Sequence, residues 1–246
     1  MASLRIKLVV FDLDGTMIDS CPDLASAANK AMLEMGRTGV TVEQVAGYIG
    51  NGADVLVSRA LSQSVEVDPA LDPETKSQAR VLFDKHYHEG GHILTTLYPG
   101  VKETLSILKE KGVILAVLTN KPSAFVPGIL EEQGIASYFV DVLGGDTFEA
   151  KKPDPVGLKW LMKKHGVLTY ETVMIGDSKN DILAAKSAGT HSIGVTYGYN
   201  YGIHISESSP DCVFDSFSPI AGLCEDGIVS LKLSPDAGYA LHLSAE

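Results

Sequence analysis

The chain has 246 residues, enough for one large α/β domain carrying a smaller insertion. It is 45% hydrophobic and 21% charged with 24 glycines, a composition typical of globular rather than disordered or fibrous proteins. The formal net charge of -11 argues against binding to nucleic acid or to an anionic membrane surface, because both need a basic face. We therefore expect a small-molecule substrate, and a site that supplies its own cations if that substrate is anionic.

The cysteines and the first residues indicate where the protein works. Cys21, Cys212 and Cys224 are widely spaced and odd in number, which predicts neither a disulfide framework nor a zinc site. No run reaches the 18 apolar residues of a membrane span, and the first apolar run soon carries Asp12 and Asp14, unlike a signal peptide. We expect a cytoplasmic protein, either a monomer or a homodimer.

Buried β-rich runs recur along the chain, and each ends in a turn. The first, residues 8–11, is continuously apolar and breaks into a glycine turn. Later runs alternate with stretches of helical apolar spacing, which predicts right-handed crossovers and a doubly wound, mostly parallel α/β sheet of Rossmann type. In such a sheet, ligands bind at the edge formed by the carboxyl ends of the strands. The later runs are residues 113–118, 138–143, 173–175 and 192–195, and the helical stretches are 101–108, 125–130, 158–162 and 182–188.

The interval between residues 18 and 97 breaks this alternation. Apolar residues in 24–35 and 79–87 have helical spacing, and Thr41 with Gln44 forms a predicted capping box. We expect residues 18–97 to form a helical cap domain inserted into a core of residues 1–17 and 98–222. The tail, residues 223–246, has weak periodicity and receives no predicted role.

Four short polar segments lie at the ends of the core runs or in the loops between them. An Asp or Thr after a strand commonly caps a helix, and a loop lysine is commonly a solvated charge, so each segment alone has an ordinary structural explanation. Those explanations do not account for the chain order of carboxylates, a hydroxyl, a lysine and again paired carboxylates. The segments are 12–16 (DLDGT), 118–120 (LTN), 152–155 (KPDP) and 176–181 (GDSKND).

The carboxylates of these segments predict a metal site. Gathering Asp12, Asp14, Asp177 and Asp181 at one sheet edge is strongly unfavourable without a cation, because close and desolvated carboxylates raise one another's pKa. Oxygen ligands with no nearby Cys or His pair fit Mg²⁺. The expected cofactor is therefore Mg²⁺.

In type and order, the four segments resemble the four motifs of the haloacid dehalogenase superfamily of phosphatases. The resemblance implies a catalytic set in which Asp12 is the nucleophile, Asp14 the general acid and base, Thr119 a phosphate-binding hydroxyl and Lys152 the phosphate-binding cation. It also implies metal ligands at Asp12, Asp14 and Asp177, with Asp181 as a supporting acid. The helical insertion is similar to the cap of this superfamily, which closes over the site.

These residue types suit the implied reaction. A carboxylate such as Asp12 can attack phosphorus and form an acyl phosphate that water then hydrolyses, which splits one hard displacement into two easier steps. Asp14, two residues on, can protonate the leaving alkoxide and then deprotonate water, a contribution of roughly 10²- to 10⁴-fold. Mg²⁺, Lys152 and Thr119 would hold the phosphoryl oxygens.

Several members of the superfamily, and proteins outside it, remain to be weighed. Asp14 argues against a dehalogenase, whose leaving group needs no proton, and the lack of any lysine between Lys30 and Lys76 argues against a phosphonatase with a cap lysine. A beta-phosphoglucomutase-like enzyme and a broad sugar-phosphate phosphatase stay open as alternatives. A receiver-like signalling domain would be shorter and lack the cap, and a catalytically silent relative is a remote alternative.

Two further stretches resemble the bacterial phosphoglycolate phosphatases of this superfamily. They are residues 48–54 (YIGNGAD) and 197–202 (YGYNYG), together with 144–146 and 151–153. The resemblance implies hydrolysis of 2-phosphoglycolate to glycolate and phosphate, a reaction of carbohydrate metabolism. We expect Asn51, Gly52 and Asn120 to bind substrate. If a helix begins near Ala53, its free N–H groups would meet the substrate carboxylate, although a plain turn explains these glycines equally well.

Overall fold

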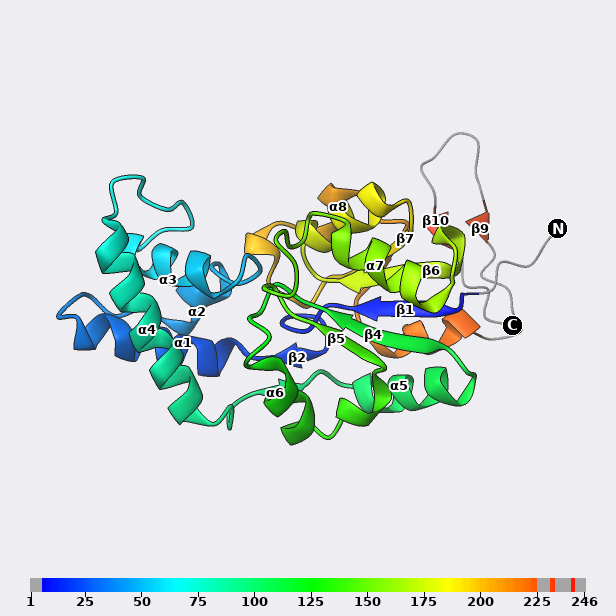
Figure 1. Cartoon of the computed structure of the whole chain (residues 1–246), viewed down its shortest axis with the longest axis horizontal. Helices are drawn as coiled ribbons and strands as arrows, with labels where there is room; N and C mark the ends of the chain where they lie inside the picture. The colour runs from blue at the N-terminus through cyan, green and yellow to red at the C-terminus, as the bar shows by residue number, and fades with distance from the viewer. Residues whose placement is uncertain (1–5, 225–230, 233–239, 242–246) are drawn as a thin grey trace.

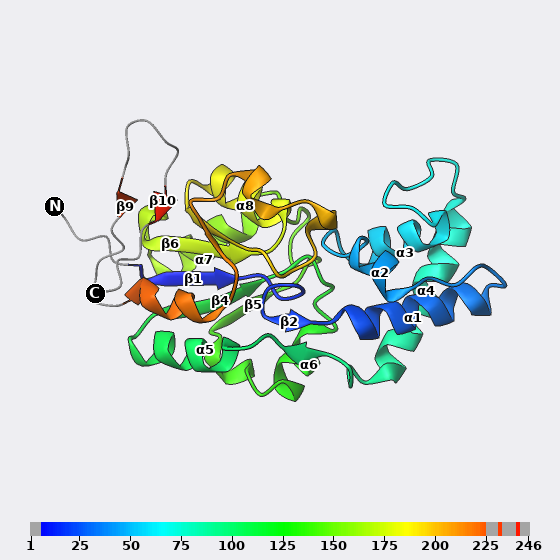
Figure 2. The same ribbon diagram turned by 180° about the vertical axis from the view of Figure 1, so that it is seen from behind.

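The computed structural model describes residues 6–224, 231–232 and 240–241. Its centre is a parallel sheet in the order β5-β4-β1-β6-β7-β8, with helices on both faces (Figure 1, Figure 2). This confirms the predicted doubly wound α/β fold. The strands are β1 (Leu8–Phe11), β4 (Ile114–Leu118), β5 (Asp141–Leu143), β6 (Thr172–Gly176), β7 (His191–Val195) and β8 (Cys212–Phe214).

The helices form two layers because the central strands bury both of their faces. Val9 and Phe11 pack into the cluster that contains α5 (Val101–Glu110), α6 (Val126–Glu132) and the 3-10 segment η5 (Ser218–Cys224). Leu8 and Val10 pack on the other side, against α7 (Val156–His165) and α8 (Lys179–Ala188). Alternate residues of a strand point to opposite faces, so a strand covered on both sides reads as a continuous apolar run.

The edges of the sheet differ from the sequence expectation. The run 138–143 starts as a 3-10 turn, η1 (Ala136–Tyr138), and only Asp141–Leu143 forms β5. This strand lies at the edge and pairs with β4 alone, beginning opposite Ala116. The short edge strand β8 was not predicted, because three residues, of which only Cys212 is buried, carry too little pattern.

The interval after the first strand is helical, as expected. The helices α1–α4 share their own hydrophobic cluster and lie to one side of the sheet (Figure 1). The predicted capping box is present, with Gln44 N donating to Thr41 Oγ1 at 3.3 Å and Thr41 N donating to Gln44 Oε1 at 2.8 Å. The helices are α1 (Cys21–Glu34), α2 (Val42–Ala46), α3 (Ala53–Ser62) and α4 (Pro73–Gly90).

The chain leaves and re-enters the core through a pair of adjacent crossings. There β2 (Ile18–Asp19) pairs antiparallel with β3 (Thr96–Leu97). A division into a cap of residues 18–97 and a core of 1–17 and 98–222 remains our proposal, supported by these crossings and by the separate cluster of the helices.

The remaining elements are short. In the predicted tail, β9 (Leu231–Lys232) pairs antiparallel with β10 (Ala240–Leu241). Among the described residues, no helix has the length and apolar character needed to cross a membrane. The other 3-10 segments are η2 (Thr169–Glu171), η3 (Asn200–Gly202) and η4 (Ile205–Ser208).

Candidate active site

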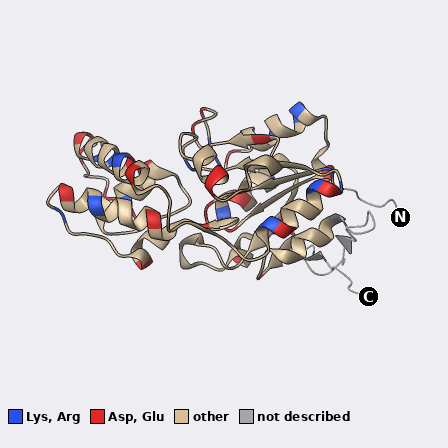
Figure 3. Ribbon diagram, turned by 90° about the horizontal axis from the view of Figure 1, so that it is seen from below, with Lys and Arg blue, Asp and Glu red and all other residues tan. Residues whose placement is uncertain are grey.

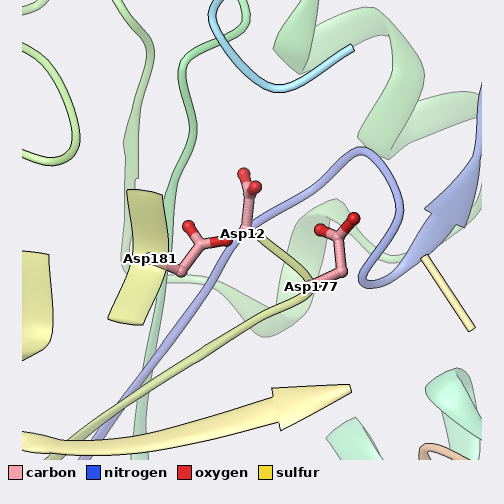
Figure 4. Close-up of side chains that lie close together, drawn as sticks. All are labelled: Asp12, Asp177 and Asp181. Atoms are coloured by element: carbon pink, nitrogen blue, oxygen red, sulfur yellow. The ribbon is translucent and has the colours of Figure 1, made fainter. Parts of the chain in front are cut away.

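Three buried carboxyl groups face one another at the carboxyl edge of the sheet. Asp12 follows β1, Asp177 follows β6, and Asp181 lies in the first turn of α8. One oxygen from each lies within 4.8 Å of the others (Figure 4). Strands β1 and β6 are hydrogen-bonded neighbours, and Asp12 N donates to Ile175 O at 2.9 Å, so the fold itself brings the first two together.

Lys152 connects this group of carboxylates. Its Nζ lies 2.9 Å from Asp12 Oδ1 and 2.6 Å from Asp181 Oδ1, and its side chain is only 1% exposed. Burial alone would lower the pKa of Lys152, but the charges of Asp12 and Asp181 raise it above its ordinary value. The residue is thus a buried ammonium group on the first aspartate, and not a solvated loop charge.

Asp181 is positioned to hold Lys152 in place. The backbone N and the hydroxyl of Ser178 donate to Asp181 Oδ2 at 3.0 and 2.9 Å, while Lys152 takes Oδ1. The side chain is fully buried and engaged on both oxygens. This arrangement fits the supporting role that we predict for it.

The electrostatics of Asp12 and Asp177 favour a cation between them. Burial raises the pKa of Asp12 to about 6, although Lys152 opposes the shift. Burial, followed by the charges of Asp12 and Asp181, raises the pKa of Asp177 to about 8. Two ionised carboxylates here need a positive partner, and an oxygen-only donor set fits a hard divalent ion such as Mg²⁺. Asp12 and Asp177 are the residues that would hold it.

Glycines allow the chain to close tightly around Asp177. A Cβ on Gly15, whose φ is +82°, would lie 2.3 Å from Asp177 Oδ2, and a Cβ on Gly198 would lie 2.2 Å from Asp177 Cβ. Asp177 is also fixed by Thr16 Oγ1, which donates to Oδ1 at 3.0 Å, and by Tyr199 N, which donates to Oδ2 at 2.7 Å. The turns at 12–16 and 197–202 therefore shape the acidic site.

Asp14 lies in the same pocket as Asp12 but outside the group of three carboxylates. Its Oδ1 and Oδ2 lie 3.0 and 3.3 Å from Lys121 Nζ, and Ser20 Oγ donates to Oδ1. The placement beside Asp12 suits an acid and base. The predicted metal-ligand role of Asp14 stays a prediction, because its carboxylate faces Lys121.

Two further predicted residues follow β4. Thr119 is buried, lines the pocket, and accepts a hydrogen bond from Lys121 N at 3.2 Å through its hydroxyl oxygen. Asn120 also lines the pocket, but its side-chain amide donates to Gly50 O at 3.0 Å and to Lys152 O at 2.9 Å. Asn120 thus ties the loop of Lys152 to the helical region, and its substrate-binding role stays a prediction.

The glycine loop before α3 packs directly on the core. Gly52 lines the pocket, and a Cβ there would lie 2.8 Å from Asn120 O, so only glycine permits this approach. Asn51 is not among the residues that line the pocket, and its Oδ1 accepts a hydrogen bond from Tyr201 OH at 2.7 Å. The substrate-binding roles of both remain predictions, and the contact of Asn51 points to holding the loop.

Sequence reasoning missed Lys121. It follows the 118–120 segment directly, its side chain is 3% exposed, and its Nζ lies 4.7 Å from the ring centroid of Tyr87. Its position just past a strand end was the available signal. Its burial could not be predicted from the sequence, because Tyr87, which packs on it, belongs to α4 and is distant in the chain.

The fold and the site together define a class of protein: an α/β enzyme with a lysine-bridged acidic centre at the carboxyl edge of a parallel sheet, facing a helical insertion. The chain belongs to the haloacid dehalogenase-like hydrolase family, whose profile matches residues 9–195. The predicted family resemblance is thereby confirmed.

Individual relatives are similar over most of their length. A phosphoglycolate phosphatase of Photobacterium profundum is 59% identical over 215 residues, which is 87% of this chain and 94% of that protein. One of Vibrio cholerae is 56% identical over 215 residues, covering 87% and 95%. A crystal structure of a predicted phosphoglycolate phosphatase from Haemophilus somnus has a TM-score of 0.82 at 42% identity, covering 87% of this chain and 96% of that one.

Proposed function

We propose that the protein hydrolyses 2-phosphoglycolate to glycolate and phosphate with Mg²⁺ and an aspartyl-phosphate intermediate. Its family and its relatives make it a phosphatase. The single observation that carries the mechanism is the buried Lys152 ammonium group, 2.9 Å from Asp12 Oδ1 and 2.6 Å from Asp181 Oδ1. The substrate follows from the shared name of relatives that match nearly their whole length.

Asp12 acts as the nucleophile in the first step. The hydrogen bond from Leu13 N at 2.7 Å and the ion pair with Lys152 Nζ at 2.9 Å both involve Asp12 Oδ1, which leaves Oδ2 for attack on phosphorus. The new bond joins Asp12 oxygen to phosphorus while the bond to the leaving alkoxide breaks. Asp14 gives the alkoxide its proton.

Water completes the cycle. Asp14, now ionised, takes a proton from a water molecule that attacks the same phosphorus, and the bond to Asp12 breaks to release phosphate. Lys152 and Thr119 bind phosphoryl oxygens, and Asp181 orients Lys152. When bound, Mg²⁺ supplies positive charge that offsets the phosphoryl oxygens and the carboxylates of Asp12 and Asp177.

The helical region covers the reacting groups with apolar side chains. Leu24, Ile49 and Phe83 line the same pocket as Asp12 and Asp14. Excluding water strengthens the interactions of charged groups in the pocket and limits side reactions. An apolar cover over Asp12 and Asp14 suits a small phosphoester.

We also infer a cytoplasmic location and no nucleic-acid partner from the net charge of -11 and the cysteine spacing. Charges of both signs are scattered over the ribbon (Figure 3), in keeping with this inference. We expect a monomer or a homodimer, which sedimentation will distinguish.

The test is phosphate release from a panel of small phosphoesters with added Mg²⁺. We expect the highest kcat/KM with 2-phosphoglycolate, loss of activity with a chelator, and no turnover by Asp12→Asn. Preference for a hexose phosphate would replace the substrate with that of a sugar-phosphate phosphatase. Undiminished turnover by Asp12→Asn would overturn the mechanism.

A further inference from the structure

The pocket contains a second buried lysine that the mechanism above does not use. Of the described residues that line this pocket, Lys121 is the one cation, and its side chain is only 3% exposed. Burial alone would lower the pKa of Lys121, but the charge of Asp14 raises it above its ordinary value, so the group stays charged. Burying an ammonium group is costly, which makes a purpose for it worth seeking.

The surroundings of Lys121 leave part of its bonding capacity unused. Its Nζ contacts Asp14 at 3.0 and 3.3 Å and lies over the ring of Tyr87, 4.7 Å from the centroid. An ammonium group has three N–H donors, and one carboxylate does not occupy them all. Nearby, the buried Tyr87 hydroxyl makes no hydrogen bond of regular geometry with the described residues, although it lies close enough to the Lys121 ammonium for each group to influence the pKa of the other. Both groups line the pocket and are available to a ligand.

The position of Lys121 follows from the position of the leaving group. Asp14 must reach the oxygen that leaves phosphorus, because it gives that oxygen its proton. Whatever the substrate carries on the carbon attached to this oxygen therefore lies beside Asp14. In the structure, the group beside Asp14 on the pocket wall is the Lys121 ammonium.

We propose that Lys121 is a specificity-determining residue that binds the substrate carboxylate while Lys152 binds the phosphoryl group. This inference rests on the proposed function and adds the residue that recognises the acid. A carboxylate one carbon away from the leaving oxygen reaches Lys121, with the Tyr87 hydroxyl as a second donor. The two buried lysines, Lys121 in the pocket wall and Lys152 on Asp12, thus match the two anionic ends of a short phosphocarboxylate.

This assignment differs from the sequence expectation at the glycine loop. Asn51 does not line the pocket and is bonded to Tyr201, whereas Lys121 lines it and carries a full charge. The competing explanation is that Lys121 serves Asp14 alone, as a counter-ion that fixes its position. The two explanations differ in whether the substrate's own charge matters.

The experiment crosses a charge change in the enzyme with a charge change in the substrate. Wild type and Lys121→Met are assayed with Mg²⁺ on 2-phosphoglycolate and on 2-phosphoglycolamide, an isostere in which a neutral amide replaces the carboxylate. We expect wild type to prefer the acid on the order of 10²-fold in kcat/KM, as for loss of a buried charged partner, and Lys121→Met to lose that preference. Lys30→Met, an exposed lysine of α1, is the matched control and should keep it.

The ratio of the two substrates decides the proposal. A general fall in activity, equal for acid and amide, would assign Lys121 to Asp14 alone and overturn it. Melting temperatures check that Lys121→Met folds; if it does not, the wild-type ratio decides, and equal kcat/KM for acid and amide overturns the proposal.

Failure of the wider function is distinguishable from this. No release by wild type from either compound or from any other phosphoester contradicts the phosphatase assignment. If phosphate is released but the acid-to-amide ratio of kcat/KM is the same in wild type and Lys121→Met, the phosphatase assignment stands and only the role of Lys121 is overturned.

Discussion

The two sides of the pocket are built by different means. On the core side, Lys152 forms ion pairs with Asp12 and Asp181. Asp177 beside them accepts hydrogen bonds from Thr16 and Tyr199. On the helical side, Leu24, Ile49 and Phe83 contribute apolar surface. Polar contacts to the core include those of the loop at 50–52 and the hydrogen bond from Ser20 Oγ to Asp14 Oδ1. Charged groups are thus concentrated on the core side, and apolar enclosure on the other.

One carbonyl of the loop at 50–52 receives two of the hydrogen bonds between the two sides. Gly50 O accepts from the side-chain amides of Asn120 at 3.0 Å and Asn180 at 3.1 Å, and Tyr201 OH bonds Asn51. Asn120 and Asn180 belong to segments that also form the acidic centre. The loop therefore packs on the core through residues next to the reacting groups, which makes substitution effects on the two sides separable by size and by kinetic parameter.

The largest effect is expected on the core side, at the nucleophile. Asp12→Asn should abolish turnover, a loss on the order of 10⁶-fold, as for removal of other covalent nucleophiles. Steady-state phosphate release measures it, and mass spectrometry of quenched wild-type enzyme should find phosphate on Asp12. Asp215→Asn, at an exposed aspartate, is the control. Phosphate trapped at another residue would contradict the assignment.

A neighbouring pair of lysines tests burial directly. Lys152→Met should lower kcat by about 10³-fold, because it removes a donor to the phosphoryl group, and should destabilise the fold by leaving Asp181 without its cation. Lys151→Met changes the exposed neighbour and should alter kcat little. Kinetics and thermal melts of both variants make the measurement. Equal effects at the two positions would show that Lys152 is not specially placed.

Metal and pH should act together on the stability of the core side. Burial raises the pKa of Asp177 from 3.8, the value of an ordinary aspartate, to about 8, so folding favours its protonated form. Without metal, the contribution of Asp177 to the free energy of unfolding is therefore fully present below about pH 4, and it is lost as pH rises toward 8. Mg²⁺ binds the ionised form, so its stabilising effect should grow over the same range.

Melting temperatures with Mg²⁺ and with a chelator, at pH 5.5 and 8.5, measure this linkage. We expect Mg²⁺ to raise the melting temperature more at the higher pH. In a domain of this size, each kcal/mol of added stability corresponds to roughly 2–4 °C. Asp177→Asn should remove most of the increase at both values. An equal increase at the two pH values, or one that survives in Asp177→Asn, would place the metal elsewhere.

The same contrast decides what could be read from the sequence. Asp12, Thr119 and Asp177 follow apolar runs that are buried on both faces, and parallel pairing then forces their convergence. Lys121 and Tyr87 meet because α4 folds back over the end of β4, a contact that no local pattern encodes. Likewise, nothing in the sequence of residues 48–54 indicates that Asn51 accepts a hydrogen bond from Tyr201.

The smallest effect is expected where the helical side meets the core. Tyr201→Phe removes the hydroxyl that donates to Asn51 Oδ1 at 2.7 Å and accepts from Asn180 Nδ2 at 3.3 Å, and it keeps the ring, whose centroid lies 5.1 Å from the guanidinium carbon of Arg59. Losing these two hydrogen bonds costs about 1–2 kcal/mol, so KM for 2-phosphoglycolate should rise roughly 5- to 30-fold. The chemical step should be unaffected, because Lys152 and Asp12 do not contact this tyrosine, so kcat should stay within about twofold of wild type. Tyr170→Phe, at an exposed tyrosine, is the matched control. A large fall in kcat for Tyr201→Phe would mean that the loop at 50–52 takes part in the reaction itself, and that the two sides of the pocket are not separable.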